Sequence, residues 1–150
     1  MKVSSIMTKN PITVAPDMPI QELAKLFVSK GFSGAPVVDK TGKFAGIVLE
    51  EGLIIKDKKI HLPTFFFMLS GFFTFGEKQF ETEMKKVAAA TVEGIMEDAP
   101  HTISPDMDVE EVATLMIEKG IHYFPVLDNG KLAGVVTKKD LVKAIAKGEI

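Results

Sequence analysis

Apolar side chains recur with helical spacing in two separate stretches of the chain. The first stripe consists of Ile20, Leu23, Ala24 and Phe27, and the second of Val109, Val112, Ala113 and Met116. Residues three and four apart lie on one face of a helix, so each stripe predicts a helix that is buried along one side. The patterns end at Gly31 and Gly120, which suit the left-handed residue that follows a helix. Asp17 and Asp106 precede the stripes, and we expect them to cap the helices.

Short runs rich in β-branched residues follow each predicted helix. They cover residues 35–38 and 44–48 in the first stretch, and 123–127 and 132–136 in the second. Asn129-Gly130 is a strong signal for a two-residue hairpin turn. Extended pieces at residues 12–14 and 102–103 precede the helices, and final helices are expected over about 50–58 and 138–147. The pattern therefore predicts the same β-α-β-β-α unit twice.

The two stretches are copies of one unit. A shift of 89 positions aligns residues 16–18 with 105–107 and Pro36-Val37 with Pro125-Val126, and the shift becomes 88 after the hairpin turn. A solenoid needs three or more stacked repeats, so two copies predict a pair packed face to face. We expect a mixed α/β (α+β) fold with pseudo-twofold symmetry. Its parts are repeat 1 (residues 1–58), an insert with a linker helix (59–91) and repeat 2 (92–150).

The insert is rich in phenylalanine. Six of the eleven Phe lie within residues 65–75, and a helical pattern follows them. Three interpretations of the rings are open: they fill a gap over the shared core or at a dimer interface, they dock on a membrane surface, or they bind a partner. We favour packing, because the neighbouring lysines do not form the basic amphipathic face that membrane docking uses. Six exposed rings would make a patch that monomers seldom tolerate, so we also expect a homodimer.

Composition excludes several classes of function. The chain has 150 residues, no cysteine and a formal net charge of −2, so a disulfide framework, thiolate zinc sites and cysteine nucleophiles are excluded. Its three histidines, His61, His101 and His122, are more than four residues apart, and no metal site is predicted. All 18 cationic side chains are Lys, and they form no basic stripe for nucleic acid.

No catalytic or membrane-spanning feature emerges from the sequence. There is no Ser/His/Asp ordering and no Gly-rich phosphate loop, so we expect no catalytic residues and no enzyme activity. The longest apolar run is shorter than the roughly 20 residues that span a bilayer. The N-terminus also lacks the apolar segment of a signal peptide. We therefore expect a cytoplasmic protein without a membrane partner.

Two sequence runs, together with the duplication, carry a resemblance to a known family. Residues 120–126 (GIHYFPV) and 134–141 (GVVTKKDL) resemble tandem CBS domains, the cystathionine-β-synthase type, and residues 33–39 and 46–48 are similar in the first copy. The resemblance implies two clefts between the repeats, frequent dimerisation, and AMP, ATP or S-adenosylmethionine as a regulatory ligand, with no cofactor required. The alternative is a ligand-free dimerisation or scaffold module that acts on a protein partner.

Thr137 and Asp140 match the family's ligand motif, in which the hydroxyl meets a phosphate and the carboxylate accepts both ribose hydroxyls. The same pair also fits a capping box, with Thr137 at the N-cap, which would stabilise the helix without any ligand. The two roles are compatible, because a helix N-terminus attracts anions. Lys138 and its neighbour Lys139 add positive charge there.

The resemblance implies further ligand contacts around this motif. Tyr123, Phe124 and Pro125 would edge the base pocket, although Phe124 equally suits the core. His122 would contact a phosphate, unless it is solvated or packed in the core. Thr102 and Ile103 would read adenine through backbone atoms.

The first copy departs from the motif. Leu49 stands where the hydroxyl is expected, Gly52 where the carboxylate is expected, and Glu50 and Glu51 replace the paired lysines. Acidic side chains suit a helix N-terminus but repel a phosphate. We therefore expect one competent cleft and one weaker cleft, with one ligand per chain. The weaker cleft would be edged by Thr13, Val14, Ala35 and Pro36.

Overall fold

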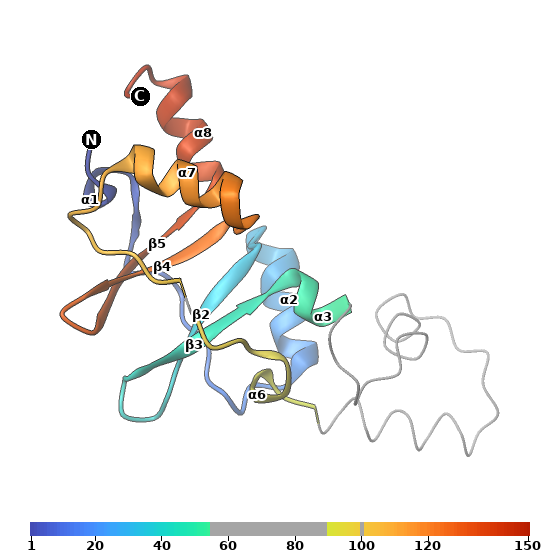
Figure 1. Cartoon of the computed structure of the whole chain (residues 1–150). Helices are drawn as coiled ribbons and strands as arrows, with labels where there is room; N and C mark the ends of the chain where they lie inside the picture. Colours follow the sequence, from blue (N-terminus) through green and yellow to red (C-terminus); the bar gives the residue numbers. More distant parts are fainter. Residues whose placement is uncertain (55–89, 100) are drawn as a thin grey trace, which may run out of the picture.

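The computed structural model describes residues 1–54, 90–99 and 101–150, which form two lobes that lie side by side (Figure 1). The elements, in chain order, are α1 (Val3–Ile6), β1 (Thr8–Lys9), α2 (Ile20–Lys30), β2 (Gly34–Val38), β3 (Phe44–Leu49), α3 (Glu50–Ile54), α6 (Val92–Ile95), α7 (Val109–Lys119), β4 (Tyr123–Asp128), β5 (Lys131–Thr137) and α8 (Lys138–Ala146). One lobe contains α2, β2, β3, α3 and α6, and the other contains α1, β1, α7, β4, β5 and α8. The mixed α/β pair is therefore confirmed. Residues 59–89 of the Phe-rich insert lie outside the described residues, so its helix and its packing stay predictions.

Helices α2 and α7 bury the stripes that the sequence predicts. All four apolar stripe residues of α2 are buried, as are three of the four in α7. Both helices end at a glycine with a positive φ of 65°, at Gly31 and at Gly120. The predicted helix ends are therefore confirmed.

The predicted helix starts are wrong. Helices α2 and α7 begin at Ile20 and Val109, three residues after Asp17 and Asp106, and no side chain caps either one. The reason is tertiary. The N–H of Ile20 donates to the Ala90 carbonyl at 3.1 Å, and that of Val109 donates to the Met1 carbonyl at 2.9 Å. Distant backbone thus satisfies the amides that a capping carboxylate would otherwise accept.

Each lobe contains one of the predicted hairpins. β2 pairs antiparallel with β3, and β4 with β5. Asn129 and Gly130 have φ angles of 50° and 80°, as the predicted two-residue turn requires. In the other hairpin, one Asp39 carboxylate oxygen accepts hydrogen bonds from the Thr41 N–H, the Thr41 hydroxyl and the Lys43 N–H. The expected first strands are reduced to single parallel bridges, Val14 to Val37 and Ile103 to Val126.

The N-terminal segment of the chain packs on the second lobe, an exchange that the repeat pattern does not indicate. Thr8 and Lys9 of β1 pair antiparallel with Val135 and Gly134 of β5. Val3 is fully buried in the core of the same lobe. The first nine residues thus belong structurally to the second lobe.

The equivalent segment of the second copy packs on the first lobe. Val92 and Ile95 of α6 are buried in its core. Ile47 and Glu97 exchange two backbone hydrogen bonds of 2.9 and 2.8 Å. Each lobe therefore takes its opening segment from the other copy, and this reciprocal exchange ties the pair together.

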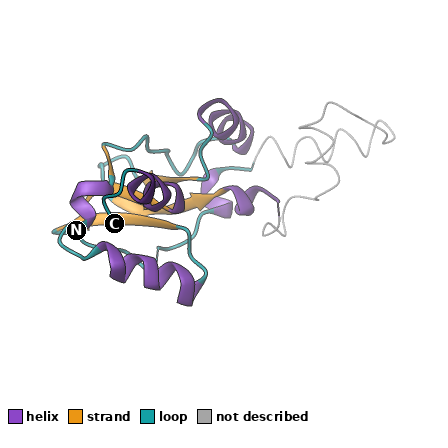
Figure 2. Ribbon diagram, turned by 90° about the horizontal axis from the view of Figure 1, so that it is seen from above, coloured by secondary structure: helices purple, strands orange, loops and turns teal. Residues whose placement is uncertain are grey.

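A small third core joins the lobes. Ile47, Tyr123 and Val135 are buried together, with Phe44, Leu49 and Ala99 packed against them. Figure 2 shows the strands of the pair with helices on both sides of them. Across the part of the chain that the structure describes, no helix combines the length and apolarity needed to cross a membrane.

Candidate functional site

A cavity of about 300 Å³ opens between the lobes beside Thr137; we call it the first cavity. The second copy contributes the end of β5 and the start of α8 to its wall. The first copy contributes Thr8, Pro11, Ile12 and the segment 30–34, where α2 ends and β2 begins. The cavity is thus built from both copies, with a helix N-terminus on one side and a helix C-terminus on the other.

Thr137 and Asp140 form the capping box at the start of α8 and also line the first cavity. The Thr137 N–H donates to Asp140 Oδ2 at 2.7 Å, and the Thr137 hydroxyl donates to the same oxygen at 2.9 Å. Only 9% of Asp140 is exposed. Its other carboxylate oxygen accepts no hydrogen bond from the residues that the structure describes. One oxygen therefore holds the helix start, and the other is available to a ligand.

Three lysines bring positive charge to the first cavity. Lys139 and Lys143 are four residues apart on one face of α8, and Lys30 comes from the end of α2. Lys139 Nζ donates to the Gly31 carbonyl at 3.4 Å, at the C-terminal end of α2, where the helix dipole favours a cation. Lys138 is not among the lining residues. The sequence motif thus contains a cavity lysine, but it is the second of the pair.

Tyr123 stands between the two sides of the site. It is opposite Thr137 in the β4–β5 ladder, and only 6% of it is exposed. A Cβ atom added to Gly34 of the first copy would lie 3.0 Å from its ring, so the ring packs closely on that backbone. Burial and the nearby Asp140 carboxylate both raise the pKa of the Tyr123 phenol far above its usual range. A phenol is protonated at neutral pH in any case, and the raised pKa extends this protonation to more alkaline solution.

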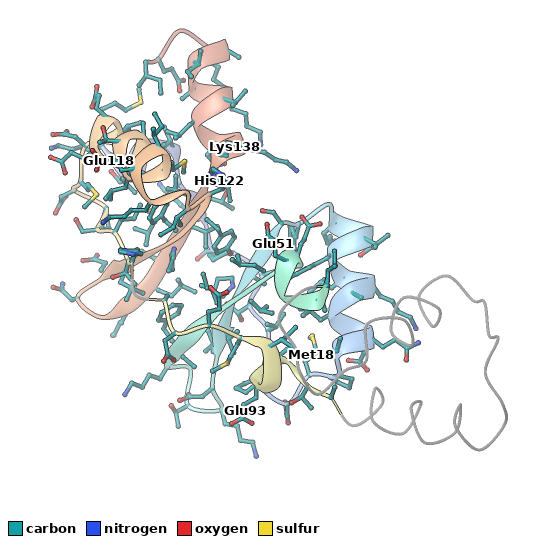
Figure 3. The ribbon with its side chains drawn as sticks, turned by 45° about the vertical axis from the view of Figure 1, so that its right-hand side comes forward. Met18, Glu51, Glu93, Glu118, His122 and Lys138 are labelled. Atoms are coloured by element: carbon teal, nitrogen blue, oxygen red, sulfur yellow. The ribbon has the colours of Figure 1, made fainter. Side chains whose placement is uncertain are left out.

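A second cavity, of about 440 Å³, lies on the other side of Tyr123. Its wall contains Leu49 and Glu51, which the 88-residue shift aligns with Thr137 and Lys139. Its polar lining also includes Ser33, Glu97, His101 and His122. In Figure 3, Glu51 and His122 come from different lobes, and each lies on the side facing the other lobe. The two cavities are thus pseudo-symmetric in position and opposite in character, since one is lined by lysines and the other by glutamates.

The family model for the CBS domain matches residues 3–58 and 92–147, once for each copy. The chain belongs to the CBS domain family. It is 30% identical to the uncharacterized protein MJ1426 of Methanocaldococcus jannaschii over 154 residues, which cover 97% of this chain and 91% of that protein. The expectation of a tandem CBS protein is therefore confirmed.

Solved CBS pairs share this fold. The structure of CBSX2, an Arabidopsis thaliana protein, in complex with AMP gives a TM-score of 0.72 at 24% identity, covering 99% of this chain and 98% of that one. The CBS domain pair of protein MJ0100, in complex with 5′-methylthioadenosine and S-adenosyl-L-methionine, gives a TM-score of 0.66 at 25% identity. That match covers 97% of this chain and 99% of the other.

The CBS pair brings together only some of the residues expected in its competent cleft. Thr137, Asp140 and Tyr123 line the first cavity, whereas His122 lines the second. The reason is the way the copies combine. Each cavity combines the start of the last helix of one copy with the segment that precedes the first hairpin strand of the other copy. Residues 120–122, which precede β4, therefore line the cavity of Leu49 and not that of Thr137.

The remaining expected residues line neither of these two cavities. Phe124 is fully buried in the core of the second lobe, which agrees with the alternative that it is a core residue. Ile103 is buried and donates its N–H to the buried Pro125 carbonyl at 3.1 Å, while Thr102 is exposed. The corresponding residues of the weaker cleft, Thr13, Val14, Ala35 and Pro36, are arranged in the same way.

Several residues that line the first cavity were not predicted from the sequence. Pro11 lies just before the expected first strand and Ile12 is its first residue, whereas Thr8 belongs to the exchanged segment. Lys30 and Lys143 read as ordinary surface lysines. The only signal for Lys143 is its spacing of four residues from Lys139, which places both on one face of α8. No group of three or more His, Asp or Glu suited to a metal ion occurs within residues 1–54, 90–99 and 101–150.

Alkaline titration is expected to report the burial of Tyr123 directly. The chain has one tyrosine and no tryptophan, so phenolate absorbance arises from this residue alone. The phenol pKa is raised in the folded state above the ordinary value of 10.0, so the contribution of Tyr123 to folding stability is constant below about pH 10. This contribution is lost progressively as the pH rises from about 10 through the raised pKa. Phenolate absorbance should therefore rise together with unfolding, followed by circular dichroism. A phenolate signal near pH 10 in the folded protein would contradict this placement.

Proposed function

We propose that this CBS pair is a regulatory ligand-sensing module that binds one adenosine-containing nucleotide in the first cavity. The observation that carries the proposal is the buried Asp140, whose second carboxylate oxygen accepts no hydrogen bond from the described residues and lies in a cavity lined by lysines. A carboxylate suits the hydroxyls of a ribose, and ammonium groups suit a phosphate. The cavity volume lies at the lower end of the roughly 300–1,000 Å³ found for small-molecule sites.

The ligands of the related structures support the same class of molecule. CBSX2 is described in complex with AMP, and the MJ0100 pair with two adenosyl compounds. The Thr137 hydroxyl donates to Asp140 Oδ2, so we assign it the role of positioning the carboxylate, and its expected phosphate contact stays a prediction. We assign ribose recognition to Asp140 and phosphate attraction to Lys139.

The second cavity is proposed to bind no phosphate-bearing ligand. Leu49 offers no hydrogen bond at the position of Thr137, and Gly52 replaces Asp140. Glu51 places negative charge where Lys139 stands in the other cavity, which repels an anion. The pair therefore binds one nucleotide per chain, as the asymmetry of the motifs predicts.

Titration calorimetry with AMP and with adenosine tests this function. We expect one AMP per chain. Lys139→Gln should weaken AMP by about 10-fold, the effect of one hydrogen bond to a charged group, and should leave adenosine unchanged. Lys138→Gln removes the same charge from the neighbouring residue outside the cavity, and we expect it to bind AMP like the parent.

Other calorimetric results would contradict the proposal. Two equal sites per chain would mean that the glutamate-lined cavity is also competent. No heat with any adenosine compound, together with no thermal shift, would favour the alternative of a ligand-free dimerisation or scaffold module. The proposed role is regulatory, and we assign no catalytic residue. A cytoplasmic location stays a prediction, and the relatives include the chloroplastic protein CBSX1 of Arabidopsis thaliana.

We also propose that the pair forms a homodimer through the outer faces of α2 and α7. Val28 and Ile117, related by the 89-residue shift, are 85% and 84% exposed. Two large apolar side chains at equivalent positions suit a twofold interface. Sedimentation should give twice the 16.4 kDa chain mass. Val28→Lys with Ile117→Lys should lower the dimer fraction, whereas Ser5→Lys on α1 should not. A monomeric parent at micromolar concentration would exclude the dimer.

A further inference from the structure

Tyr123 is a buried residue whose hydroxyl has no hydrogen-bond partner among the residues that the structure describes. Only 6% of the residue is exposed. Buried hydroxyl groups are nearly always hydrogen-bonded, because leaving water without a replacement partner is unfavourable. A phenylalanine would fill the same space without this penalty. The hydroxyl therefore needs a role other than packing.

The position of Tyr123 indicates what this role is. It lines the first cavity beside Thr137, its partner across the β4–β5 ladder. Asp140, which is bonded to Thr137, is close enough for its charge to act on the Tyr123 phenol. A phenol is protonated at neutral pH, so the Tyr123 oxygen carries a proton to donate. A donor and a free carboxylate acceptor thus lie in the same corner of the cavity.

We propose that Tyr123 is a specificity-determining residue that donates a hydrogen bond to a ligand hydroxyl, which in turn donates a hydrogen bond to Asp140. The proposal rests on the proposed nucleotide function and names the group that this site reads. The protonated phenol donates, and the free carboxylate oxygen only accepts. A hydroxyl accepts from the first and donates to the second, and an ether or a methylene group cannot do both. The two ribose hydroxyls of an adenosine compound can each accept and donate in this way, and a deoxyribose lacks one of these two hydroxyls.

The test is Tyr123→Phe in the full chain, which removes the hydroxyl and keeps the ring against Gly34. Calorimetry would compare adenosine with 2′-deoxyadenosine and 3′-deoxyadenosine. We expect the parent to prefer adenosine over at least one deoxy compound by about 10-fold or more, because the missing hydroxyl makes two hydrogen bonds. The variant should bind adenosine about 10-fold more weakly, and its preference should shrink by a similar factor, because the hydrogen bond from the ligand hydroxyl to Asp140 remains.

Stability gives a second, opposite readout. A buried hydroxyl without a partner does not stabilise the unliganded fold, so Tyr123→Phe should unfold at the same temperature as the parent or at a higher one. If the role of the hydroxyl were purely structural, its removal would instead lower the stability of the protein. In the parent, tyrosine fluorescence should change when adenosine binds, because Tyr123 is the only tyrosine and there is no tryptophan.

The outcomes separate this inference from the function on which it rests. If the parent binds no adenosine compound, the nucleotide function fails, and the role of Tyr123 fails with it. If the parent binds adenosine and Tyr123→Phe keeps the same affinity and the same preference over both deoxy compounds, the function stands and the assignment of Tyr123 is wrong. Reduced affinity and a reduced preference in a variant of undiminished stability support the assignment.

Discussion

Asp140→Ala is expected to weaken the binding of adenosine compounds by about 1 to 3 kcal/mol, or about 5- to 150-fold, because a charged hydrogen-bond acceptor is lost. The same change should lower the free energy of unfolding by about 1 to 2 kcal/mol, since the cap of α8 is removed. The Thr137 N–H and hydroxyl, which both donate to Asp140 Oδ2, would lose their acceptor. Calorimetry and urea unfolding measure the two effects separately.

Asp140→Asn separates the two roles of this side chain. Its amide oxygen can still accept from Thr137, so most of the stability should return, while the negative charge offered to the ribose is absent. Asp106→Ala removes an exposed carboxylate from a turn outside both cavities and is the matched control. If Asp140→Ala bound adenosine like the parent and lost only stability, Asp140 would be a helix cap alone. The ligand site would then have to be placed elsewhere.

Gly134→Ala is expected to destabilise the fold by about 2 to 3 kcal/mol, as overpacked sites do. A Cβ atom at this position would lie 2.6 Å from the Thr8 carbonyl oxygen and 3.0 Å from Met7 Sδ. The sulfur can move, but the carbonyl is held by the pairing of β1 with β5. Relief therefore requires the exchanged segment to shift. For a chain of this size, the melting temperature should fall by roughly 5 to 10 °C.

The same argument applies to the other copy and has a built-in control. A Cβ atom on Gly46 would lie 2.4 Å from the Glu97 carbonyl oxygen, so Gly46→Ala should be at least as harmful. At Gly52 the nearest atom, the Ile95 carbonyl oxygen, is 3.4 Å away, and Gly52→Ala should change stability by less than about 1 kcal/mol. Equal, small effects at all three glycines, measured by urea unfolding, would mean that the exchanged segments are only loosely attached.

The elements that the sequence predicts well are those specified by neighbours a few residues apart. The stripes of α2 and α7 follow from spacings of three and four, and the Asn129-Gly130 turn follows from two residues that accept a positive φ. The capping box joins Thr137 to Asp140 within one helical turn. The duplication and the family motifs then indicate two such units in one pair.

Contacts between distant segments decided the rest. Ile20 and Val109 receive their backbone acceptors from residues 90 and 1, so the helices begin where those segments lie and not at the aspartates. Gly134 and Gly46 allow a carbonyl of the other copy to approach, and no local pattern shows which carbonyl it is.

In the candidate site, too, the sequence predicts some features and tertiary contacts decide the others. The sequence by itself determined that one copy carries Thr137 and Asp140 and that the other carries Leu49 and Gly52, because these are chemical identities. Only the tertiary structure decided which groups face them. It placed Lys30 opposite α8, His122 in the second cavity, and Tyr123 in the same cavity wall as Asp140. The physical reason is that each cavity closes across two copies about 90 residues apart, and side-chain patterns within one copy carry no information about that contact.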